Sequence, residues 1–300
     1  MKVLISGKNS QLGREFSSFL DDKSFEFFLY DSETLNLMNE ELVRSVILDI
    51  CPDIIINFSA YTDVDGAEHE AEKVFKVNTE GPTLLSKISN DMGSYFIHIS
   101  TDYVFGIQGE GPFSSTVTPK PINTYGKSKL NGEINILKNN NKSLIIRTSA
   151  IFSNFNNNFV KNIIKKILEL DDLRIVSDQK IALTSAADLA YFIYYILKKN
   201  VFNLLIKESP NRIIHFTNTG YTNWYEVALY IRKKLDYLKI KFGSITPISS
   251  NDWISLAERP KDSRLEIDYG IFNSLDIKLY PWQDRVDKII KYQLSGKKDE

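Results

Sequence analysis

A tyrosine and a lysine four positions apart, Tyr125 and Lys129, could form a proton-transfer pair. On a helix, positions i and i+4 lie on one face. A nearby ammonium favours the phenolate and lowers the pKa of a phenol from about 10, so the phenol can exchange a proton with a substrate oxygen. The spacing alone is weak evidence, because the chain has four more such pairs: Tyr194/Lys198, Tyr195/Lys199, Tyr230/Lys234 and Tyr237/Lys241.

Hydroxyl and carboxyl side chains precede Tyr125. Residues 94–100 have the apolar character of a buried strand, and Thr101 and Asp102 follow directly. Because side chains at the carboxyl end of a parallel strand face the ligand crevice, Ser100 or Thr101 could hydrogen-bond a carbonyl oxygen. The other four tyrosine–lysine pairs follow no such strand end. We therefore select Tyr125 and Lys129 as the chemical pair.

The loop between the first predicted strand and the first predicted helix could bind a pyrophosphate. Gly7 and Gly13 lie six positions apart, with Ser10 where a third glycine is expected. Gly7 allows a tight turn, Gly13 lets helix and strand approach closely, and the helix N-terminus presents free N–H groups. The glycine spacing is common, but its place after a strand strengthens it. The predicted cofactor contacts are Gly7, Ser10, Gln11, Leu12 and Gly13.

Asp31 ends the second predicted strand, where a carboxylate can accept hydrogen bonds from an adenosine ribose. It would repel a 2′-phosphate and so favours NADH, whereas Lys8 could offset this for NADPH. A strand-end turn is an equally good interpretation of Asp31 taken alone. Five further residues are predicted to contact the cofactor: Asn36, Leu37, Ser59, Ala60 and Thr62.

Short apolar runs alternate with longer amphipathic segments along the first half of the chain. Strands are predicted at 3–6, 25–30, 53–57, 94–100 and 143–147, and helices at 11–20, 40–50, 71–92 and 123–137. This alternation implies right-handed crossovers and a parallel sheet. The second half is less regular, with helices at 158–170, 185–200 and 224–236, a strand at 212–217, and a final helix through 294.

The predicted fold class is therefore α/β, a Rossmann-type doubly wound parallel sheet with a smaller, mixed C-terminal substrate domain. Residues 1–150, with about 170–200, are assigned to the NAD(P)-binding domain. Residues 151–169 and 201–294 are assigned mainly to the substrate domain, and 295–300 to a polar tail.

The bulk composition excludes several classes of protein. A net charge of −1 argues against a dedicated nucleic-acid binder. The single cysteine rules out an internal disulfide framework, and it forms no zinc-ligand spacing with the three histidines, so no metal site is predicted. No apolar run has membrane-spanning length, and the first residues resemble a strand rather than a signal peptide. Cytoplasmic residence without a membrane partner is expected.

Taken together, the glycine loop, the run from Ser100 to Phe105 and the Tyr125/Lys129 pair resemble the extended short-chain dehydrogenase/reductase superfamily. Within it, the chain is similar to dTDP-4-dehydrorhamnose reductases. The similar segments are 57–68, 77–78, 121–133, 147–149, 157–159, 178–179, 218–220, 224 and 259–263. The resemblance therefore covers nearly the whole chain.

The resemblance implies that NADPH or NADH reduces the C4 keto group of a nucleoside-diphosphate 4-keto-6-deoxy sugar in deoxysugar or polysaccharide biosynthesis. Tyr125 would protonate the resulting alkoxide, and Lys129 would lower the pKa of the tyrosine and hold the nicotinamide ribose. Thr101 would position the keto oxygen. The implied substrate contacts are Thr101, Asp102, Tyr103 and Ala150.

The resemblance also allows a homodimer with Mg²⁺ at its contact. Glu15 is a candidate ligand for that ion, although an ordinary surface glutamate is the interpretation we prefer.

The chain departs from the family pattern at three places. Ser10 replaces a glycine, Ala150 replaces the tryptophan expected after Arg-Thr-Ser, and 180–184 lacks the usual glycine and proline. The sugar, the nucleotide and the product stereochemistry therefore stay open.

Two alternatives to the reductase also remain. One is an epimerase or 4,6-dehydratase of the same superfamily, although Tyr103 stands where a dehydratase typically has glutamate. The other is a non-catalytic regulatory homologue.

Overall fold

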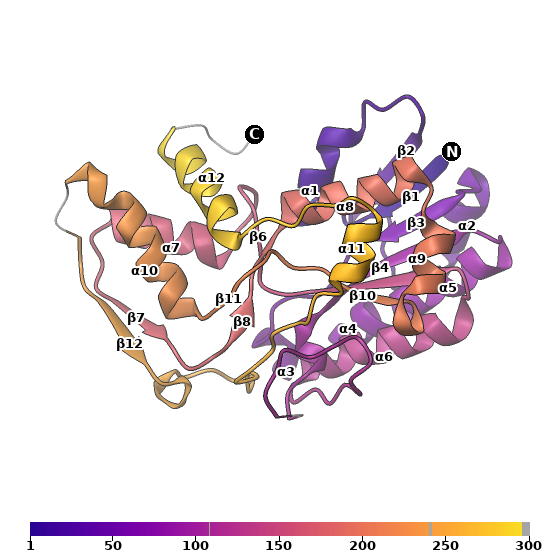
Figure 1. Ribbon diagram of the computed structural model, residues 1–300. Helices are drawn as coiled ribbons and strands as arrows, with labels where there is room; N and C mark the ends of the chain where they lie inside the picture. Colours follow the sequence, from indigo (N-terminus) through magenta and orange to yellow (C-terminus); the bar gives the residue numbers. More distant parts are fainter. Residues whose placement is uncertain (108, 240–241, 296–300) are drawn as a thin grey trace.

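The computed structural model describes residues 1–107, 109–239 and 242–295, and a six-stranded sheet lies at its centre (Figure 1). The strand order is β10-β5-β4-β3-β1-β2, and every neighbouring pair is parallel. The strands are β1 (Lys2–Ser6), β2 (Glu26–Tyr30), β3 (Ile54–Asn57), β4 (Tyr95–Thr101), β5 (Ser143–Thr148) and β10 (Ile213–His215). The predicted Rossmann-type α/β fold is confirmed.

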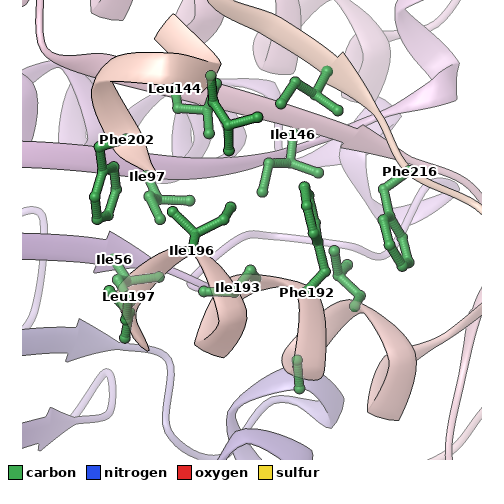
Figure 2. Close-up of a cluster of buried hydrophobic side chains, with 14 of the residues drawn as sticks. Ile56, Ile97, Leu144, Ile146, Phe192, Ile193, Ile196, Leu197, Phe202 and Phe216 are labelled. Atoms are coloured by element: carbon green, nitrogen blue, oxygen red, sulfur yellow. The ribbon is translucent and has the colours of Figure 1, made fainter. Parts of the chain in front are cut away.

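Helices cover both faces of this sheet because its strands are apolar on both sides. One face carries α1 (Gln11–Phe16), α8 (Ala186–Lys199), α9 (Phe202–Glu208) and α11 (Tyr269–Ser274). The other carries α2 (Glu40–Ile50), α5 (Gly81–Asp91) and α6 (Thr124–Asn139). Successive strand side chains point to opposite faces, so Ile54 and Ile56 pack against the helices on the α8 side and Ile55 packs against those on the α2 side. Figure 2 shows Phe192, Ile193, Ile196 and Leu197 of α8 facing Ile56, Ile97, Leu144 and Ile146.

A second hydrophobic cluster forms at one end of the sheet, on the left of Figure 1. Its helices are α7 (Phe159–Leu168), α10 (Trp224–Leu235) and α12 (Trp282–Leu294). Short strands accompany them: β6 (Ile151–Phe152), β7 (Leu173–Val176), β8 (Ile181–Ala182), β9 (Thr184–Ser185), β11 (Tyr221–Thr222) and β12 (Ile245–Ile248). The pairs β7/β12 and β6/β9 are parallel, and β8/β11 is antiparallel. The domain boundaries at 150, 170 and 200 stay a prediction.

The helix predicted over 71–92 is broken. It consists of α4 (Ala71–Phe75), a π turn over Lys76–Glu80 and α5. Pro82 in the first turn of α5 has no N–H to donate to the carbonyl of Asn78, so a regular helix cannot run through this point. At this break the side chain of Asn78 accepts a hydrogen bond from the backbone amide of Tyr61, and it donates to the carbonyl oxygen of Tyr61 and to the hydroxyl of Ser128.

Other elements differ from their predicted bounds at the ends. The helix predicted over 11–20 ends at Phe16 and continues as a 3₁₀ turn over Ser17–Phe19. The short helices α3 (Gly66–His69) and α9 were not predicted. The strand predicted over 212–217 shortens to β10. Except for Ser295, the predicted tail 295–300 lies outside the described residues.

Within the described residues, no single helix is both long and apolar enough to cross a membrane. Helices α8 and α9 together have the length and apolar composition of a membrane span, but they meet at a bend of 112°. The apolar residues of α8 pack against the sheet.

Helix α6 is anchored to the sheet by a buried ion pair and two glycines. Arg147 on β5 donates to Glu133 on α6 through Nη2 at 2.7 Å and Nε at 3.0 Å, and both side chains are at most 2% exposed. A Cβ at Gly126 would overlap the carbonyl oxygen of Tyr103, and one at Gly132 would overlap that of Asn78. The helix therefore lies closer to its neighbours than side chains would permit.

We expect Glu133→Gln to lower the free energy of unfolding by about 3 kcal/mol or more, because it leaves the Arg147 guanidinium buried without a counter-charge. Urea unfolding measures this. Glu40→Gln is the matched control, since it breaks an exposed pair with Arg44 and should leave stability nearly unchanged. Equal, small losses in both variants would show that the buried pair does not anchor α6.

Candidate active site

A cavity opens at the carboxyl end of the sheet, where the strand order reverses between β1 and β3. From β1 the chain runs to β2 on one side, and β3 lies on the other. Open α/β sheets bind ligands in the crevice at such a point. The cavity has a volume of about 730 Å³, within the usual range of a ligand pocket.

Most of the predicted site residues line this cavity, although they come from distant parts of the sequence. On the cofactor side they are Gly7, Ser10, Gln11, Leu12, Asp31, Ser59, Ala60 and Thr62. On the chemical and substrate side they are Thr101, Asp102, Tyr125, Lys129 and Ala150. The folded chain therefore brings the two predicted groups into one space.

Four of the predicted site residues lie outside the lining of the cavity. Leu37 is buried in the cluster beneath α2 and α5, and Asn36 accepts a hydrogen bond from the amide of Met38 at 3.0 Å. Gly13 lies under the loop. The Tyr103 ring lies edge-on to Tyr125, with 5.8 Å between ring centroids. None of the four lines the cavity.

The glycine loop is tightly packed. Gly7 has a φ of +84°, and a Cβ there would lie 2.7 Å from the amide nitrogen of Ser59, so the loops after β1 and β3 touch. A Cβ at Gly13 would overlap the carbonyl oxygen of Gly7. Ser10 has a φ of −69° and accepts a hydrogen bond from the amide of Gly13 at 3.0 Å. A serine therefore fits this position without strain, as the N-cap of α1.

Asp31 is held as an ionised carboxylate at one end of the cavity. Hydrogen bonds from the hydroxyl and amide of Thr34, and from Lys8, hold the pKa of Asp31 well below its usual range. The Thr34 hydroxyl donates at 2.8 Å, and the Lys8 ammonium lies 3.0 Å from the other carboxylate oxygen. The Lys8 ammonium and the Asp31 carboxylate therefore lie together at the place where the sequence predicts that the adenosine ribose binds.

Tyr125 presents a protonated phenol to the cavity. Burial raises the pKa of Tyr125 to about 12, against a smaller lowering by its hydrogen bond with the Thr101 hydroxyl. The expected lowering by a neighbouring ammonium is therefore not what governs this phenol. A protonated phenol is the form that can donate a proton to an alkoxide.

The Lys129 side chain points toward β4. Its Nζ donates to the carbonyl oxygen of Ile99 at 2.7 Å and lies 3.1 Å from Nε2 of His98. Lys129 is 1% exposed, and burial lowers the pKa of its amine to about 8. Its orientation explains why burial, not the lysine charge, dominates at Tyr125.

Asp102 is a buried carboxyl group, and no cationic side chain among the described residues pairs with it. Thr101 donates to it at 3.1 Å and Ser149 at 2.7 Å, and Ser263 gives a further hydrogen bond. Burial raises the pKa of Asp102 to about 6, although these hydroxyl groups oppose the rise. Tyr125, Thr101, Asp102 and Ser149 therefore form one continuous polar chain.

An aromatic wall, which was not assigned from the sequence, closes the substrate side. Phe159 and Trp224 lie 4.6 Å apart between ring centroids, and Trp224 donates to Gln179 at 3.2 Å. Both residues lie in segments that resemble the family, 157–159 and 224. This resemblance is the signal by which the sequence could have identified them. Ala150 lines the same region with a φ of +40°.

The described residues contain no group of three or more His, Cys, Asp or Glu side chains placed to hold a metal ion. Burial raises the pKa of Glu15, and the charge of Asp188 adds to this. Asp188 is itself paired with Arg285 at 2.7 Å. The Mg²⁺ prediction at Glu15 gains no support.

Comparisons with known proteins extend over the whole chain. The family model described as "RmlD substrate binding domain" matches residues 1–294. A dTDP-4-dehydrorhamnose reductase from Aggregatibacter actinomycetemcomitans is 33% identical, over 97% of this chain and 99% of the relative.

Solved structures agree with this match. A dTDP-4-dehydrorhamnose reductase from Clostridium acetobutylicum has a TM-score of 0.87 at 30% identity, covering 98% of this chain and 100% of that one. Another from Bacillus anthracis, in complex with NADP, has a TM-score of 0.84 at 32% identity, covering 97% and 99%.

Asp102→Asn should stabilise the protein at pH 8 by up to about 3 kcal/mol, because the pKa of Asp102 rises from 3.8 to about 6 on folding. A raised carboxyl pKa makes ionisation costly above pH 6, and asparagine cannot ionise. The gain should vanish at pH 4, which urea unfolding at both pH values measures.

Asp22→Asn provides a control of opposite sign. Hydrogen bonds from Lys198 and Tyr194 hold the pKa of Asp22 below its usual range, so this variant should lose stability at pH 8. An Asp102→Asn effect that is the same at pH 4 and pH 8 would contradict the buried-carboxyl explanation.

Proposed function

The chain belongs to the family described as RmlD substrate binding domain, and we propose that it reduces the C4 keto group of a nucleoside-diphosphate 4-keto-6-deoxy sugar with NAD(P)H. It is an NAD(P)H-dependent oxidoreductase of nucleotide sugars, in deoxysugar biosynthesis. The observation that carries the proposal is the Tyr125–Thr101 hydroxyl pair, which shares one cavity with the glycine loop.

The residues of the loop fit a dinucleotide. Gly7 and Gly13 let the loop pack closely, because a Cβ at either position would overlap neighbouring backbone. Gly7, Ser10, Gln11 and Leu12 line the cavity. In our proposal these residues hold the pyrophosphate, and Asp31 and Lys8 take the adenosine ribose. Small side chains after β3, at Ser59, Ala60 and Thr62, line the space beside them. When bound, the nicotinamide supplies the hydride.

The protein supplies orientation and a proton. Tyr125 donates its phenolic proton to the oxygen of the reduced carbonyl. Thr101 positions that oxygen through its hydroxyl group, which is hydrogen-bonded to Tyr125. The hydroxyl of Ser100 is buried at the cavity and has no hydrogen-bond partner within the described residues, so it is available to the same ligand. Lys129 holds the nicotinamide ribose in this proposal, with its ammonium or amine N–H as donor.

In our proposal the substrate is bound by Asp102, Ala150 and the aromatic wall of Phe159 and Trp224. Asp102 holds the sugar while Ser149 fixes the carboxyl. Ala150 leaves open the space that the family's tryptophan would fill, so Phe159 and Trp224 provide the aromatic surface for the nucleotide. Tyr103 supports the Tyr125 ring from behind. A homodimer and residence in the cytoplasm stay predictions.

Tyr125→Phe should reduce kcat by about 10²–10⁴-fold, the usual contribution of a positioned general acid, and leave the Kd for the cofactor nearly unchanged. Turnover is followed by the consumption of NADPH or NADH. Tyr230→Phe is the matched control, because Tyr230 has the same spacing to a lysine but bonds Asp287 on α12, away from the cavity. Near-normal reduction by Tyr125→Phe would refute the proposed proton donor.

The substrate is tested with a panel of dTDP-, CDP-, GDP- and UDP-linked 4-keto-6-deoxy sugars. A reductase consumes one equivalent of NAD(P)H for each sugar, whereas an epimerase that recycles its cofactor consumes none. No turnover with any sugar, together with a stable protein partner in pull-downs, would favour a non-catalytic regulatory role.

Asp31→Asn should shift the cofactor preference toward NADPH by about tenfold in the ratio of the two KM values, since it removes the charge that repels a 2′-phosphate. Lys8→Met should shift the ratio the other way, because it leaves Asp31 unneutralised. Steady-state kinetics with both cofactors measure the ratio. Shifts of the same sign in both variants would contradict the roles of this ion pair.

A further inference from the structure

The segment between β6 and α7, residues 153–158, is hydrogen-bonded to the glycine loop at two places. Asn156 donates to the carbonyl oxygen of Asn9 at 2.8 Å. The side-chain amide of Asn158 donates to Oε1 of Gln11 at 3.1 Å, and Asn158 is 8% exposed. The proposed function assigns Gln11 to the pyrophosphate but gives no role to Asn158.

The side-chain amide of Asn158 has a fixed orientation. Asn158 is the N-cap of α7, and its Oδ1 lies 3.1 Å from the backbone N–H of Lys161. A backbone N–H can only donate, so the atom that faces it must be the oxygen. The NH₂ group of Asn158 therefore faces the other way, where it donates to the carbonyl oxygen of Ser153 at 2.9 Å and to Gln11.

This orientation decides the orientation of the Gln11 amide. Because the NH₂ group of Asn158 can only donate, the Gln11 atom that lies 3.1 Å from it must be the carbonyl oxygen. The Ser153 hydroxyl lies 3.0 Å from the same atom, but a hydroxyl can donate or accept and so fits either orientation. Asn158 is therefore the contact that fixes the Gln11 amide.

The NH₂ group of Gln11 is left open to a ligand. No atom of residues 1–107, 109–239 or 242–295 accepts a hydrogen bond from it, and the group is not sealed from solvent. Gln11 lines the cavity. An ionised phosphate oxygen only accepts hydrogen bonds, so it would be attracted by this NH₂ group and repelled by the oxygen of a reversed amide.

We propose that Asn158 is a positioning residue for the cofactor: it holds the Gln11 carboxamide with the NH₂ group toward the cavity, where that group donates to the pyrophosphate. The inference deepens the proposed function and rests on its assignment of the glycine loop to a dinucleotide. A residue outside the loop thus decides whether a side-chain donor in the loop is correctly oriented.

Asn158 also belongs to the substrate side of the cavity. As the N-cap of α7 it directly precedes Phe159, which forms the aromatic wall with Trp224. One residue therefore connects the proposed phosphate donor with the proposed surface for the sugar nucleotide. A displacement at the start of α7 would change both.

The first test uses the native full-length protein without a sugar. ¹H–¹⁵N NMR observes the side-chain NH₂ group of Gln11, and Gln11→Met assigns its signals. We expect these protons to exchange readily with water in the free protein. They should shift and become protected when NADP⁺ or ADP-ribose is added, because both ligands carry the pyrophosphate. Signals that are protected in the free protein, or that neither ligand changes, would overturn the proposal.

The second test removes the proposed donor. Gln11→Met should raise the Kd for NAD(P)H, measured by cofactor fluorescence, by about tenfold, because it deletes a hydrogen bond to a charged group. Gln283→Met on α12 is the matched control, since Gln283 does not line the cavity and its loss should leave the Kd unchanged.

The third test reverses the amide with a nearly isosteric change. In Asn158→Asp one carboxylate oxygen still accepts from Lys161 as the helix cap, and the other now faces Gln11. The Gln11 amide should turn its NH₂ group to this carboxylate and its oxygen to the cavity. We expect the Kd for NAD(P)H to rise about tenfold or more, because the orientation that binds becomes the minor one.

Two controls separate the orientation of Gln11 from the added charge. Asn156→Asp places a carboxylate in the same segment without a bond to Gln11, so the Kd should rise less than in Asn158→Asp. In a Gln11→Met background, Asn158→Asp should raise the Kd at most about twofold further, because no amide is left to reverse. An equal rise from Asn158→Asp with and without Gln11 would refute the proposal.

An uncharged variant covers the case in which Asn158→Asp does not fold. Asn158→Ser keeps a good N-cap but removes the NH₂ group, so both orientations of Gln11 become accessible and the Kd should rise about twofold. The Gln11 NH₂ signals should broaden or double in this variant. Unchanged signals and an unchanged Kd would contradict the positioning role.

These outcomes are distinct from those of the proposed function. A native protein that binds neither NADPH nor NADH would contradict the proposed function itself. Normal cofactor binding that Gln11→Met leaves unchanged would contradict only the role of Asn158 and Gln11. The binding measurements need no turnover, so they do not depend on whether a sugar in the panel is reduced.

Discussion

The docking of α6 against the sheet is the constraint on which the site depends. Both proposed chemical groups on this helix, Tyr125 and Lys129, reach the cavity because α6 packs closely against the turn after β4 and against the π turn. The buried Arg147–Glu133 pair sets the position of the helix along β5, and Gly126 and Gly132 allow the close approach. If α6 lay further from the sheet by the width of a side chain, Tyr125 and Lys129 would not line the same cavity.

Burial then decides the ionisation of the groups that this docking brings together. Burial favours the neutral form of the four ionisable groups on this side of the cavity. It raises the pKa of Tyr125 and Asp102, and it lowers the pKa of Lys129 and His98. Hydroxyl donors compensate Asp102 only in part. The charged end of the cavity lies instead at Asp31 and Lys8, where the pair is partly exposed to water. The site is therefore divided into a neutral chemical end and a charged end that suits a ribose or phosphate.

Two departures from the family pattern have a structural explanation. Ser10 needs no left-handed backbone and caps α1, so the missing glycine does not disturb the loop. At Ala150 the lost aromatic surface has a neighbour that can replace it, the Phe159–Trp224 pair. For the third departure, 180–184, the structure gives two short strands, β8 and β9, which pair with β11 and β6.

The sequence by itself determined the alternation of strands and helices, the glycine loop, and the choice of Tyr125 and Lys129 among five similar pairs. These are local properties: apolar runs, turn residues and spacing along one helix. It did not determine the break at the π turn, the positions of Asn36 and Leu37 away from the cavity, or the Phe159–Trp224 wall. Each depends on contacts between segments far apart in the chain.

The ionisation states belong to the tertiary structure as well. The sequence suggested a lysine that lowers the pKa of a tyrosine, because the two are neighbours on a helix. Only the folded chain shows that Lys129 turns to His98 and Ile99 on another strand, and that burial outweighs the spacing. The spacing of residues along the sequence shows which side chains can be neighbours. The charge of each side chain depends on its burial and on its hydrogen-bond partners, and both of these are set by the whole fold.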